Sequence, residues 1–321
     1  MQATSIYEPV KEGLERVEQN LLDVANLRFP FLAQVLAHVF ESKGKRIRPA
    51  IALLASEFSE HDPEITEVMA SGVELLHVAS LIHDDTVDES DIRRGRATLS
   101  SLWGSNVAVQ AGDYVFASAA AFMCDTGDIQ VIRRFSKTIM ALASGQLQEA
   151  ADAHVLDQTR DHYLGRIYNK TASLFETASE SGAILSGASE ETVNAMCVYG
   201  RSLGLGFQIV DDILDFEGAE EVVGKPVGSD LANGVLTLPA IIAMERSPSD
   251  NPVRALFKEP GDDRRLAEAV AMVQDPAIIE ESYEFARGLC HRSLECLKDL
   301  PRIPARDSLE EIVEYVLTRR K

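Results

Sequence analysis

The sequence predicts an all-α protein, and three observations support this fold class. Apolar residues recur at three- and four-residue spacings in five long segments, and these segments are rich in Ala, Leu and Gly. No alternation of strand and helix patterns runs along the chain, which argues against a parallel sheet. The 321 residues show no abrupt change in composition, and 45% of them are hydrophobic. We therefore expect a single domain over residues 1–321, built from ten or more helices around a sizeable core.

Turn-forming residues separate the expected helices. The five long helical segments are Ile65–Asp88, Asn106–Met123, Val131–Ala151, Tyr163–Ser186 and Glu190–Phe216. Clusters of Gly, Pro, Asp and Ser mark the breaks, at Ser59–Pro63, Asp125–Asp128, Glu217–Gly234, Ser247–Pro252, Glu259–Arg264 and Asp299–Asp307. The longest of these breaks, Glu217–Gly234, is our candidate for a lid over a binding site, because long polar loops inside compact domains are often functional.

Charge and composition exclude several classes of protein. The formal net charge of -20 argues against a nucleic-acid partner, which would need a basic face. The four cysteines form no CxxC pair and stand beside no histidine cluster, so neither a zinc site nor a disulfide framework is expected. Residues Met1–Leu22 are too charged for a signal peptide, and no run approaches the roughly 20 apolar residues of a membrane span. We expect a cytoplasmic protein.

Two segments carry the same DDxxD pattern, and each follows an apolar helical run. The first aspartate motif consists of Asp84, Asp85 and Asp88, and the second of Asp211, Asp212 and Asp215. Residues four apart share one face of a helix, so the outer carboxylates of each motif point together. Such carboxylates repel one another unless a cation neutralises them. Hard oxygen ligands in small number suit Mg²⁺, which also keeps water and substrate phosphate oxygens in its shell.

The pair of motifs is far more specific than either motif alone. At the average abundance of aspartate, one DDxxD arises by chance in about one chain of this length in fifteen, and two arise in far fewer. A single motif would be read as a solvated helix end. Two motifs, each joined to an apolar helix, predict a site for a metal-bound diphosphate.

Basic residues near the first aspartate motif supply the charge that a diphosphate needs. Gly44–Pro49 reads GKRIRP, and Arg93, Arg94 and Arg96 follow the motif directly. Arginine binds phosphate oxygens in a fork, and lysine binds them as a point charge. Further candidate donors lie elsewhere in the chain, at His77, Lys170, Thr171 and Lys225.

Five ordered motifs resemble the trans-isoprenyl diphosphate synthase family, also called polyprenyl synthetases. The resemblance extends over about residues 43–239. The matching segments are GKRIRP at Gly44–Pro49, LLHVASLIHDDTVDESDIRRG at Leu75–Gly95, GDYVFA at Gly112–Ala117, KTASLF at Lys170–Phe175, and GLGFQIVDDILDF through KPVGSDL within Gly204–Leu231.

The resemblance implies an isoprenoid-synthase-like helical bundle around a central cavity, usually assembled as a homodimer. It implies two or three Mg²⁺ ions per active site, with Asp84, Asp88 and Asp211 as ligands and Asp85, Asp212 and Asp215 as nearby partners. The residues expected to bind isopentenyl diphosphate are Lys45, Arg48, His77 and Arg94. Those expected to bind the allylic diphosphate are Arg93, Lys170, Thr171, Gln208 and Lys225. The expected catalytic residues are Lys170 and all six aspartates of the two motifs.

The implied activity is the head-to-tail condensation of isopentenyl diphosphate with an allylic diphosphate to give an all-trans polyprenyl diphosphate. Ala79 and Ser80 lie about one helical turn before Asp84, where a bulky aromatic residue would stop chain growth. Their small size predicts a product of C20 or longer. The DESD run at Asp88–Asp91 resembles long-chain members and favours C30–C50. Release of so apolar a product implies transient contact with a membrane.

One departure from the family pattern keeps an alternative open. Relatives with a GKxTLP segment carry lysine where this chain has Val235, so one contact to the allylic diphosphate is expected to be missing. A partner-dependent or non-catalytic subunit of a heteromeric prenyl diphosphate synthase is therefore the alternative function. A terpene cyclase would lack the paired basic motifs. A di-iron protein would need a second ExxH helix besides Glu74–His77.

Overall fold

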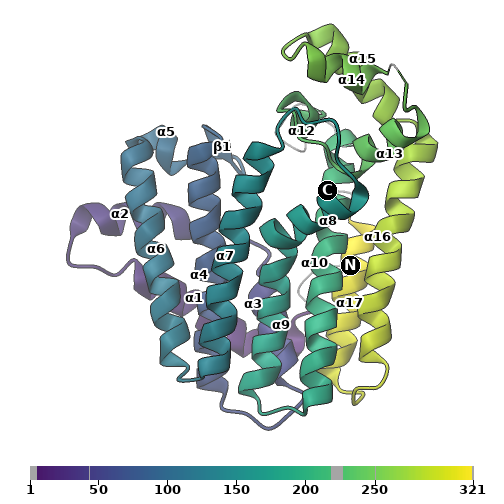
Figure 1. Cartoon of the computed structure of the whole chain (residues 1–321). Helices are drawn as coiled ribbons and strands as arrows, with labels where there is room; N and C mark the ends of the chain where they lie inside the picture. Colours follow the sequence, from purple (N-terminus) through teal and green to yellow (C-terminus); the bar gives the residue numbers. More distant parts are fainter. Residues whose placement is uncertain (1–5, 43, 218–226, 250, 320–321) are drawn as a thin grey trace. The chain divides into compact units, whose positions relative to one another are not determined.

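The structure is a computed structural model that describes residues 6–42, 44–217, 227–249 and 251–319. These residues form helices almost throughout, which confirms the all-α prediction (Figure 1). The one sheet in this part of the chain is a two-stranded antiparallel hairpin of β1 (Ile92–Arg93) and β2 (Arg96–Ala97). Lys225 and half of the candidate lid, residues 218–226, lie outside the described residues, so the structure describes only Glu217 and residues 227–234 of that segment.

The chain separates into two compact units. The first unit comprises Met1–Thr138, Leu174–Gly200 and Asp299–Glu311, and the second comprises Ile139–Ser173, Arg201–Lys298 and Ile312–Lys321. Each unit contains one aspartate motif. The single domain over residues 1–321 stays a prediction.

Most of the predicted helices and breaks recur at nearly the expected residues. The helices that lie wholly in the first unit are η1 (Glu8–Val10), α1 (Lys11–Val24), α2 (Pro30–Phe40), α3 (Ile47–Ser56), α4 (Pro63–Val87), α5 (Leu99–Trp103) and α6 (Ser105–Asp125). Those wholly in the second are α8 (Arg160–Ile167), η2 (Tyr168–Ala172), α12 (Ser229–Ala232), α13 (Leu238–Arg246), α14 (Pro252–Lys258), α15 (Asp263–Val273) and α16 (Pro276–Leu297). The remaining helices have residues in both units: α7 (Ile129–Ala151), α9 (Ser173–Leu185), α10 (Glu190–Glu217) and α17 (Pro304–Thr318).

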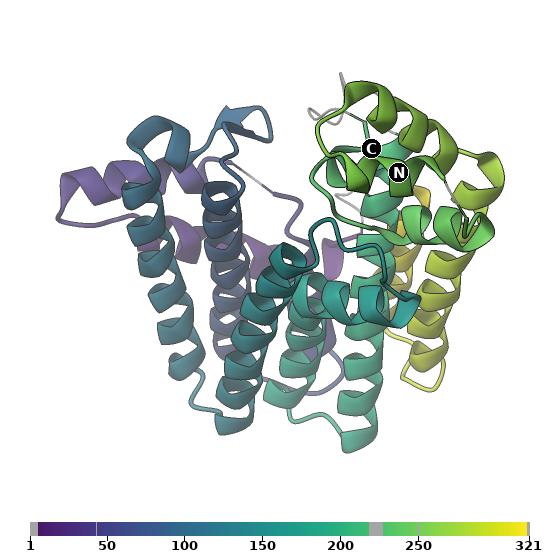
Figure 2. The same cartoon turned by 45° about the horizontal axis from the view of Figure 1, so that its top comes forward.

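Helix α4 is the central element of the first unit. Its start is fixed by Pro63 at the first helical position and by Asp62, whose side chain accepts a hydrogen bond from the Glu64 amide. Its buried residues include Met69, Val73 and Leu76, spaced three and four apart as expected for a core face. α4 packs against α1, α3 and most extensively α6, and Figures 1 and 2 show α4 and α6 running side by side.

A π-helical turn interrupts the segment predicted as one helix over Tyr163–Ser186. The turn η2 carries Lys170 and Thr171 between α8 and α9. Gly145 of α7 allows it to pack closely, since a Cβ at Gly145 would lie 2.7 Å from the Lys170 amide nitrogen. A π turn shifts the side chains that follow it around the helix, and such turns frequently occur at functional sites. Nothing in the hydrophobic period of the sequence signals this interruption.

Two helices meet the length and composition of a membrane span, contrary to the expectation that no apolar run approaches one. They are α4 and α6, with 61% and 33% of their most apolar windows buried inside the protein. Core helices of water-soluble proteins pass the same test, so the two are weak evidence for a span. The burial of α4 is that of a core helix.

Close helix packing in the first unit gives a test of the fold. A Cβ at Gly182 in α9 would lie 2.2 Å from the Ala52 carbonyl oxygen in α3. We expect Gly182→Ala to lower the free energy of unfolding by about 1–3 kcal/mol, because the backbone of α3 must shift. Gly288→Ala is the matched control. A Cβ at Gly288 in α16 meets nothing within 4 Å, so this change should stabilise the protein by up to about 1 kcal/mol. Urea denaturation of both variants measures the difference, and equal effects would contradict the packing.

Candidate functional site

The first aspartate motif lies at the carboxyl end of α4. Asp88 is the C-cap residue, and its amide donates to the Asp84 carbonyl 2.8 Å away, so the two residues are one turn apart as predicted. Asp85 is buried, Asp84 is half-buried and Asp88 is exposed. Three carboxylates at the negative end of a helix dipole are unfavourable unless cations compensate them. This end of α4 is therefore prepared for positive charge.

One of those charges comes from the hairpin that follows α4. Arg93 Nε lies 2.5 Å from Asp85 Oδ1. The hairpin turn places Arg94 and Gly95 at positive φ, 50° and 75°, as a type I′ turn requires. Asp85 is thus held by a protein cation, whereas Asp84 and Asp88 lie on the more accessible side of the helix.

The GKRIRP segment divides its cations between two roles. Arg46, which has a left-handed backbone, forms ion pairs with Glu18 and with Glu74, the latter at 2.6 Å. Arg48 instead lies 3.3 Å from His77 Nε2 through its Nη1 and 4.4 Å above the Phe175 ring. Lys45 is exposed. Arg46 therefore holds the segment in place, while Lys45 and Arg48 remain on the predicted diphosphate-binding surface.

His77 faces several positive charges. Burial, followed by the charges of Arg48, Arg94 and Arg93, lowers the pKa of His77 well below its ordinary value. A neutral imidazole whose Nε2 accepts from Arg48 keeps its proton on Nδ1. The structure thus brings together three of the four residues predicted to bind isopentenyl diphosphate, His77, Arg48 and Arg94.

A small amphipathic cavity lies under the hairpin of the first unit. Its volume is about 90 Å³, and its polar wall includes Asp85, Arg93 and Arg94. Val78, Leu81 and Ile82 of α4 supply much of the apolar wall. Charged groups at one side of an apolar cavity suit a ligand with an anionic head and a hydrocarbon chain.

The two residues predicted to limit chain length differ in their surroundings. Ala79 is completely buried in the core of the first unit. Ser80 is half-buried, and its hydroxyl donates to the His77 carbonyl 2.8 Å away. Only Ser80 is accessible enough to touch a bound chain in this conformation, and it lies one turn from Asp84.

The second aspartate motif occupies the last two turns of α10, and its middle residue is held by a hydrogen-bond network. Tyr163 Oη donates to Asp212 Oδ2 at 2.6 Å, and Gln208 Nε2 donates to Asp212 Oδ1 at 2.8 Å. Thr171 Oγ1 donates to Gln208 Oε1 at 2.6 Å. Burial, followed by the charge of Asp230, raises the pKa of Asp212 well above its ordinary value, and the two hydrogen bonds oppose that shift. This network links two predicted allylic-site residues to the motif.

The other two aspartates of the motif have different partners. Asp215 accepts from the Ser229 hydroxyl at 2.7 Å and from the Asp230 amide at 3.3 Å, which ties it to the first turn of α12. The Asp211 side chain is 42% exposed, and Arg319 donates to its Oδ1 at 2.6 Å. Asp211 is therefore more accessible than the buried Asp212, and its role as a metal ligand stays a prediction.

Lys170 has a partner that the sequence did not reveal. Its ammonium group forms an ion pair with Glu149 of α7. The sequence analysis also assigned no role to Tyr163, Phe175 and Arg319. Phe175 ends the KTASLF segment, but no local spacing predicted its contact with Arg48. Nor did any spacing predict the contacts of Tyr163 with Asp212 and of Arg319 with Asp211.

A separate group of potential metal ligands lies in the first unit. In the described part of the chain, Glu176, Glu180 and Cys197 are the one set of three whose ligand atoms lie within 4.8 Å of one another. Arg134 lies between the two carboxylates, with Nη2 2.5 Å from Glu176 and Nε 2.9 Å from Glu180. Burial raises the pKa of the Cys197 thiol to about 12. An arginine already neutralises this cluster and the thiol keeps its proton, so it resembles an internal ion pair rather than a metal site.

The Glu74–His77 pair, considered above as half of a di-iron site, has other partners in the structure. Glu74 forms an ion pair with Arg46, and His77 faces arginines rather than carboxylates. Neither side chain of the Glu74–His77 pair is therefore disposed to bind iron.

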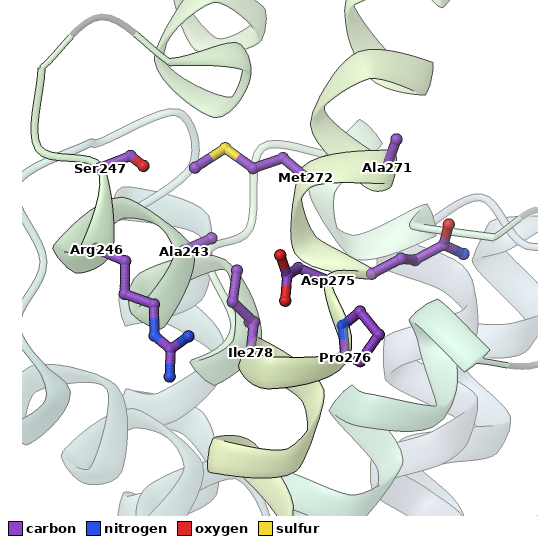
Figure 3. A pocket seen from close by; sticks show the side chains of 9 residues that line it. Ala243, Arg246, Ser247, Ala271, Met272, Asp275, Pro276 and Ile278 are labelled. Carbon is purple, nitrogen blue, oxygen red and sulfur yellow. The ribbon is translucent and has the colours of Figure 1, made fainter.

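A cavity of about 370 Å³ in the second unit contains none of the predicted site residues. Figure 3 shows its lining side chains from the end of α13, the end of α15 and the start of α16. Asp275, which lines it, caps α16 by accepting from the Ala277 amide. This cavity lies between helix ends, and no residue of either aspartate motif lines it.

Comparison with known proteins gives a consistent result. The family model described as polyprenyl synthetase matches residues 29–273. The chain is similar to solanesyl-diphosphate synthase 2, chloroplastic, of Oryza sativa subsp. japonica, with 38% identity over 98% of this chain and 79% of that protein. It is also similar to heptaprenyl diphosphate synthase component 2 of Geobacillus stearothermophilus, with 35% identity over 98% of both chains.

A solved structure agrees in fold. The crystal structure of a decaprenyl diphosphate synthase from Rhodobacter capsulatus superposes with a TM-score of 0.92 and 34% identity, covering 99% of both chains. This likeness extends beyond the roughly 200 residues of the sequence motifs to the whole chain.

The environment of His77 predicts a pH effect on stability. The folded pKa is lowered, so below about pH 6.5 the unfolded chain binds a proton that the folded chain does not. The contribution of the neutral His77 ring to the free energy of unfolding is therefore fully present above about pH 6.5, and it decreases as the pH falls below that value. We expect the unfolding free energy of the wild type to fall by up to about 1.4 kcal/mol per pH unit more than that of His77→Gln. Urea denaturation at pH 7.5 and 5.5 measures this, and parallel pH profiles would contradict it.

Proposed function

The chain belongs to the polyprenyl synthetase family and is a prenyltransferase, and from this premise we propose a Mg²⁺-dependent long-chain all-trans polyprenyl diphosphate synthase. The observation that carries the proposal is the pair of aspartate motifs, each at the carboxyl end of a helix and each leaving at least one carboxylate accessible. The relatives named for solanesyl, heptaprenyl and decaprenyl products support a product of C30–C50.

The donor set fits Mg²⁺. Asp84 and Asp88 offer two carboxylates one turn apart, and Asp211 offers a third that is 42% exposed. Mg²⁺ is bound in proteins by one or two carboxylates together with water and phosphate oxygens. When bound, it stabilises the negative charge that develops on the departing diphosphate. Asp85, Asp212 and Asp215 already have protein partners and orient the motifs.

The basic residues bind and orient the two substrates. Lys45, Arg48 and Arg94 form the cationic surface for isopentenyl diphosphate, with the Nδ1 proton of His77 as a further donor. Thr171 and Gln208 direct their dipoles toward the second motif, where we place the allylic diphosphate with Lys170 as a cationic partner. Arg93 and Lys225 stay predicted partners of that diphosphate from the sequence resemblance. Holding both substrates in reacting geometry removes much of the entropic cost of the reaction.

The reaction needs no nucleophilic side chain. The bond between C1 of the allylic substrate and its diphosphate oxygen breaks, leaving an allylic cation. The double bond of isopentenyl diphosphate attacks this cation through C4, and the proton lost from C2 passes to the released diphosphate. The apolar wall of Val78, Leu81 and Ile82 helps to exclude water, which would otherwise capture the cation.

A homodimer is the proposed assembly. In the first unit, Phe29, Phe31, Leu102 and Val109 are 61%, 42%, 47% and 44% exposed. In the second unit, Met140 and Leu147 of α7 are 61% and 72% exposed. Exposed apolar residues in such number favour contact with another chain. We place the protein in the cytoplasm, with transient membrane contact at product release.

A partner-dependent subunit is the second candidate. It is favoured by the similarity to a protein named as component 2 of a heptaprenyl diphosphate synthase. Size-exclusion chromatography with light scattering, together with a product assay on the purified chain, separates the candidates. A dimer that makes product alone supports the homodimeric enzyme. An inactive chain that gains activity with a second polypeptide supports the subunit.

The central test of the proposal is a product assay. Labelled isopentenyl diphosphate is incubated with a geranyl or farnesyl primer and Mg²⁺, and the dephosphorylated alcohols are sized. We expect one long product that disappears with chelator, and a loss of at least about a hundredfold in kcat for Asp84→Ala and for Asp211→Asn.

The exposed Glu64→Gln, at the opposite end of the same helix as Asp84, is the control and should retain activity. Full activity of both aspartate variants, or activity in chelator, would contradict a metal-bound diphosphate at these motifs.

A second prediction concerns product length. Ser80→Phe places a ring one turn from Asp84 on a half-buried surface, so we expect a product shorter by at least one isoprene unit, roughly the 5.4 Å of a helical turn. Ala79→Phe is expected to lower the Tm, because Ala79 has no exposed surface. Product sizing and thermal melts of both variants measure this. An unchanged product from a folded Ser80→Phe enzyme would contradict the assignment.

A further inference from the structure

Arg319, the residue after α17, is bound to the second aspartate motif. Its Nη2 donates to Asp211 Oδ1 at 2.6 Å and to the Phe207 carbonyl at 2.8 Å. Its guanidinium carbon lies 3.7 Å from the centre of the Phe207 ring. The Arg319 side chain is only 8% exposed. The arginine is therefore held by three contacts on one turn of α10, about 110 residues away in the sequence.

The cation is located where the motif needs compensation. Asp211, Asp212 and Asp215 lie near the negative end of α10, and Asp230 adds a further charge close to Asp212. Carboxylates crowded at a helix carboxyl end destabilise the fold unless a cation offsets them. Arg319 supplies such a cation directly at Asp211, whose side chain is 42% exposed.

Arg319 occupies the same carboxylate that the proposed function assigns to the metal. A guanidinium and a divalent cation both gain by binding a carboxylate, and each raises the electrostatic cost of binding the other nearby. We infer that Arg319 is an exchangeable counter-ion of Asp211, which holds the motif before the metal binds and yields the carboxylate when the metal arrives. This inference rests on the proposed function, because it takes Asp211 as a metal ligand.

The environment of Arg319 favours exchange over a permanent clamp. Its Nε is buried and has no hydrogen-bond partner among the described residues. A buried donor without a partner is costly, so the arginine is not at its best position for hydrogen bonding. Asp211, in contrast, is 42% exposed and can accept a second cation without burial. A diphosphate arriving with the metal would offer oxygens to the released guanidinium.

The test is Mn²⁺ binding without any diphosphate, measured from the electron paramagnetic resonance signal of the free ion. We expect Arg319→Gln to bind Mn²⁺ about three- to tenfold more tightly than the wild type, because the competing cation is gone. In EDTA the variant should melt about 2–4 °C below the wild type, and it should regain more than the wild type when Mn²⁺ is added.

Arg306→Gln is the matched control. Arg306 is also a poorly exposed arginine of α17, and it pairs with Glu310 at 2.9 Å in the first unit. Its removal should lower the Tm equally with EDTA and with Mn²⁺, and should leave the Mn²⁺ affinity unchanged.

A double-mutant comparison shows whether the effect passes through Asp211. In an Asp211→Asn background, Arg319→Gln should no longer tighten Mn²⁺ binding, and ions bound at Asp84 and Asp88 cancel from the difference. Unchanged or weaker Mn²⁺ binding by Arg319→Gln would overturn the inference, even if the variant had a raised KM for the allylic diphosphate.

The product assay of the wild type separates the two levels of failure. If the wild type makes product while Arg319→Gln leaves Mn²⁺ binding unchanged, the counter-ion inference fails and the proposed function stands. If the wild type makes no product and binds no Mn²⁺, the proposed function fails and the inference falls with it.

Discussion

Carboxylates at the carboxyl ends of helices are the constraint on which both aspartate motifs depend. α4 ends on the first aspartate motif and α10 ends on the second, so each motif adds negative charge where the helix dipole is already negative. This negative charge destabilises the helix end unless cations lie nearby to compensate it. Arg93 at Asp85 and Arg319 at Asp211 are such cations within the protein itself, and the proposed Mg²⁺ would supply further positive charge.

Within each motif the aspartates have different tasks. Asp85 and Asp212 are both buried. Asp85 is paired with Arg93, and Asp212 accepts hydrogen bonds from Tyr163 and Gln208. They fix the position of the helix end at some cost in desolvation, which the hydrogen bonds reduce. Asp84, Asp88 and Asp211 are more accessible than these two, and they are the carboxylates to which we assign the proposed metal. One repeated sequence pattern thus produces a buried carboxylate and a more accessible carboxylate in the same turn.

The sequence predicted the helices and both motifs because these depend on local periodicity and spacing. It did not predict the π turn at Lys170 and Thr171, which packs closely against Gly145 of another helix. Nor did the sequence show that Arg46 and Arg48 have different partners, because both are basic residues of one motif. Arg46 forms ion pairs with Glu18 and Glu74, whereas Arg48 lies beside His77. The sequence also did not predict the contacts of Tyr163 and Arg319, because their aspartate partners are 49 and 108 residues away in the chain.

The location of bound metal tests this account most directly. Crystals grown with Mn²⁺ and inorganic diphosphate would reveal each ion by its anomalous scattering. We expect anomalous peaks beside Asp84 and Asp88 and beside Asp211, with the diphosphate oxygens in the coordination shell. Peaks at neither motif, or a peak only at Glu176 and Glu180, would contradict the proposal that the aspartate motifs bind metal.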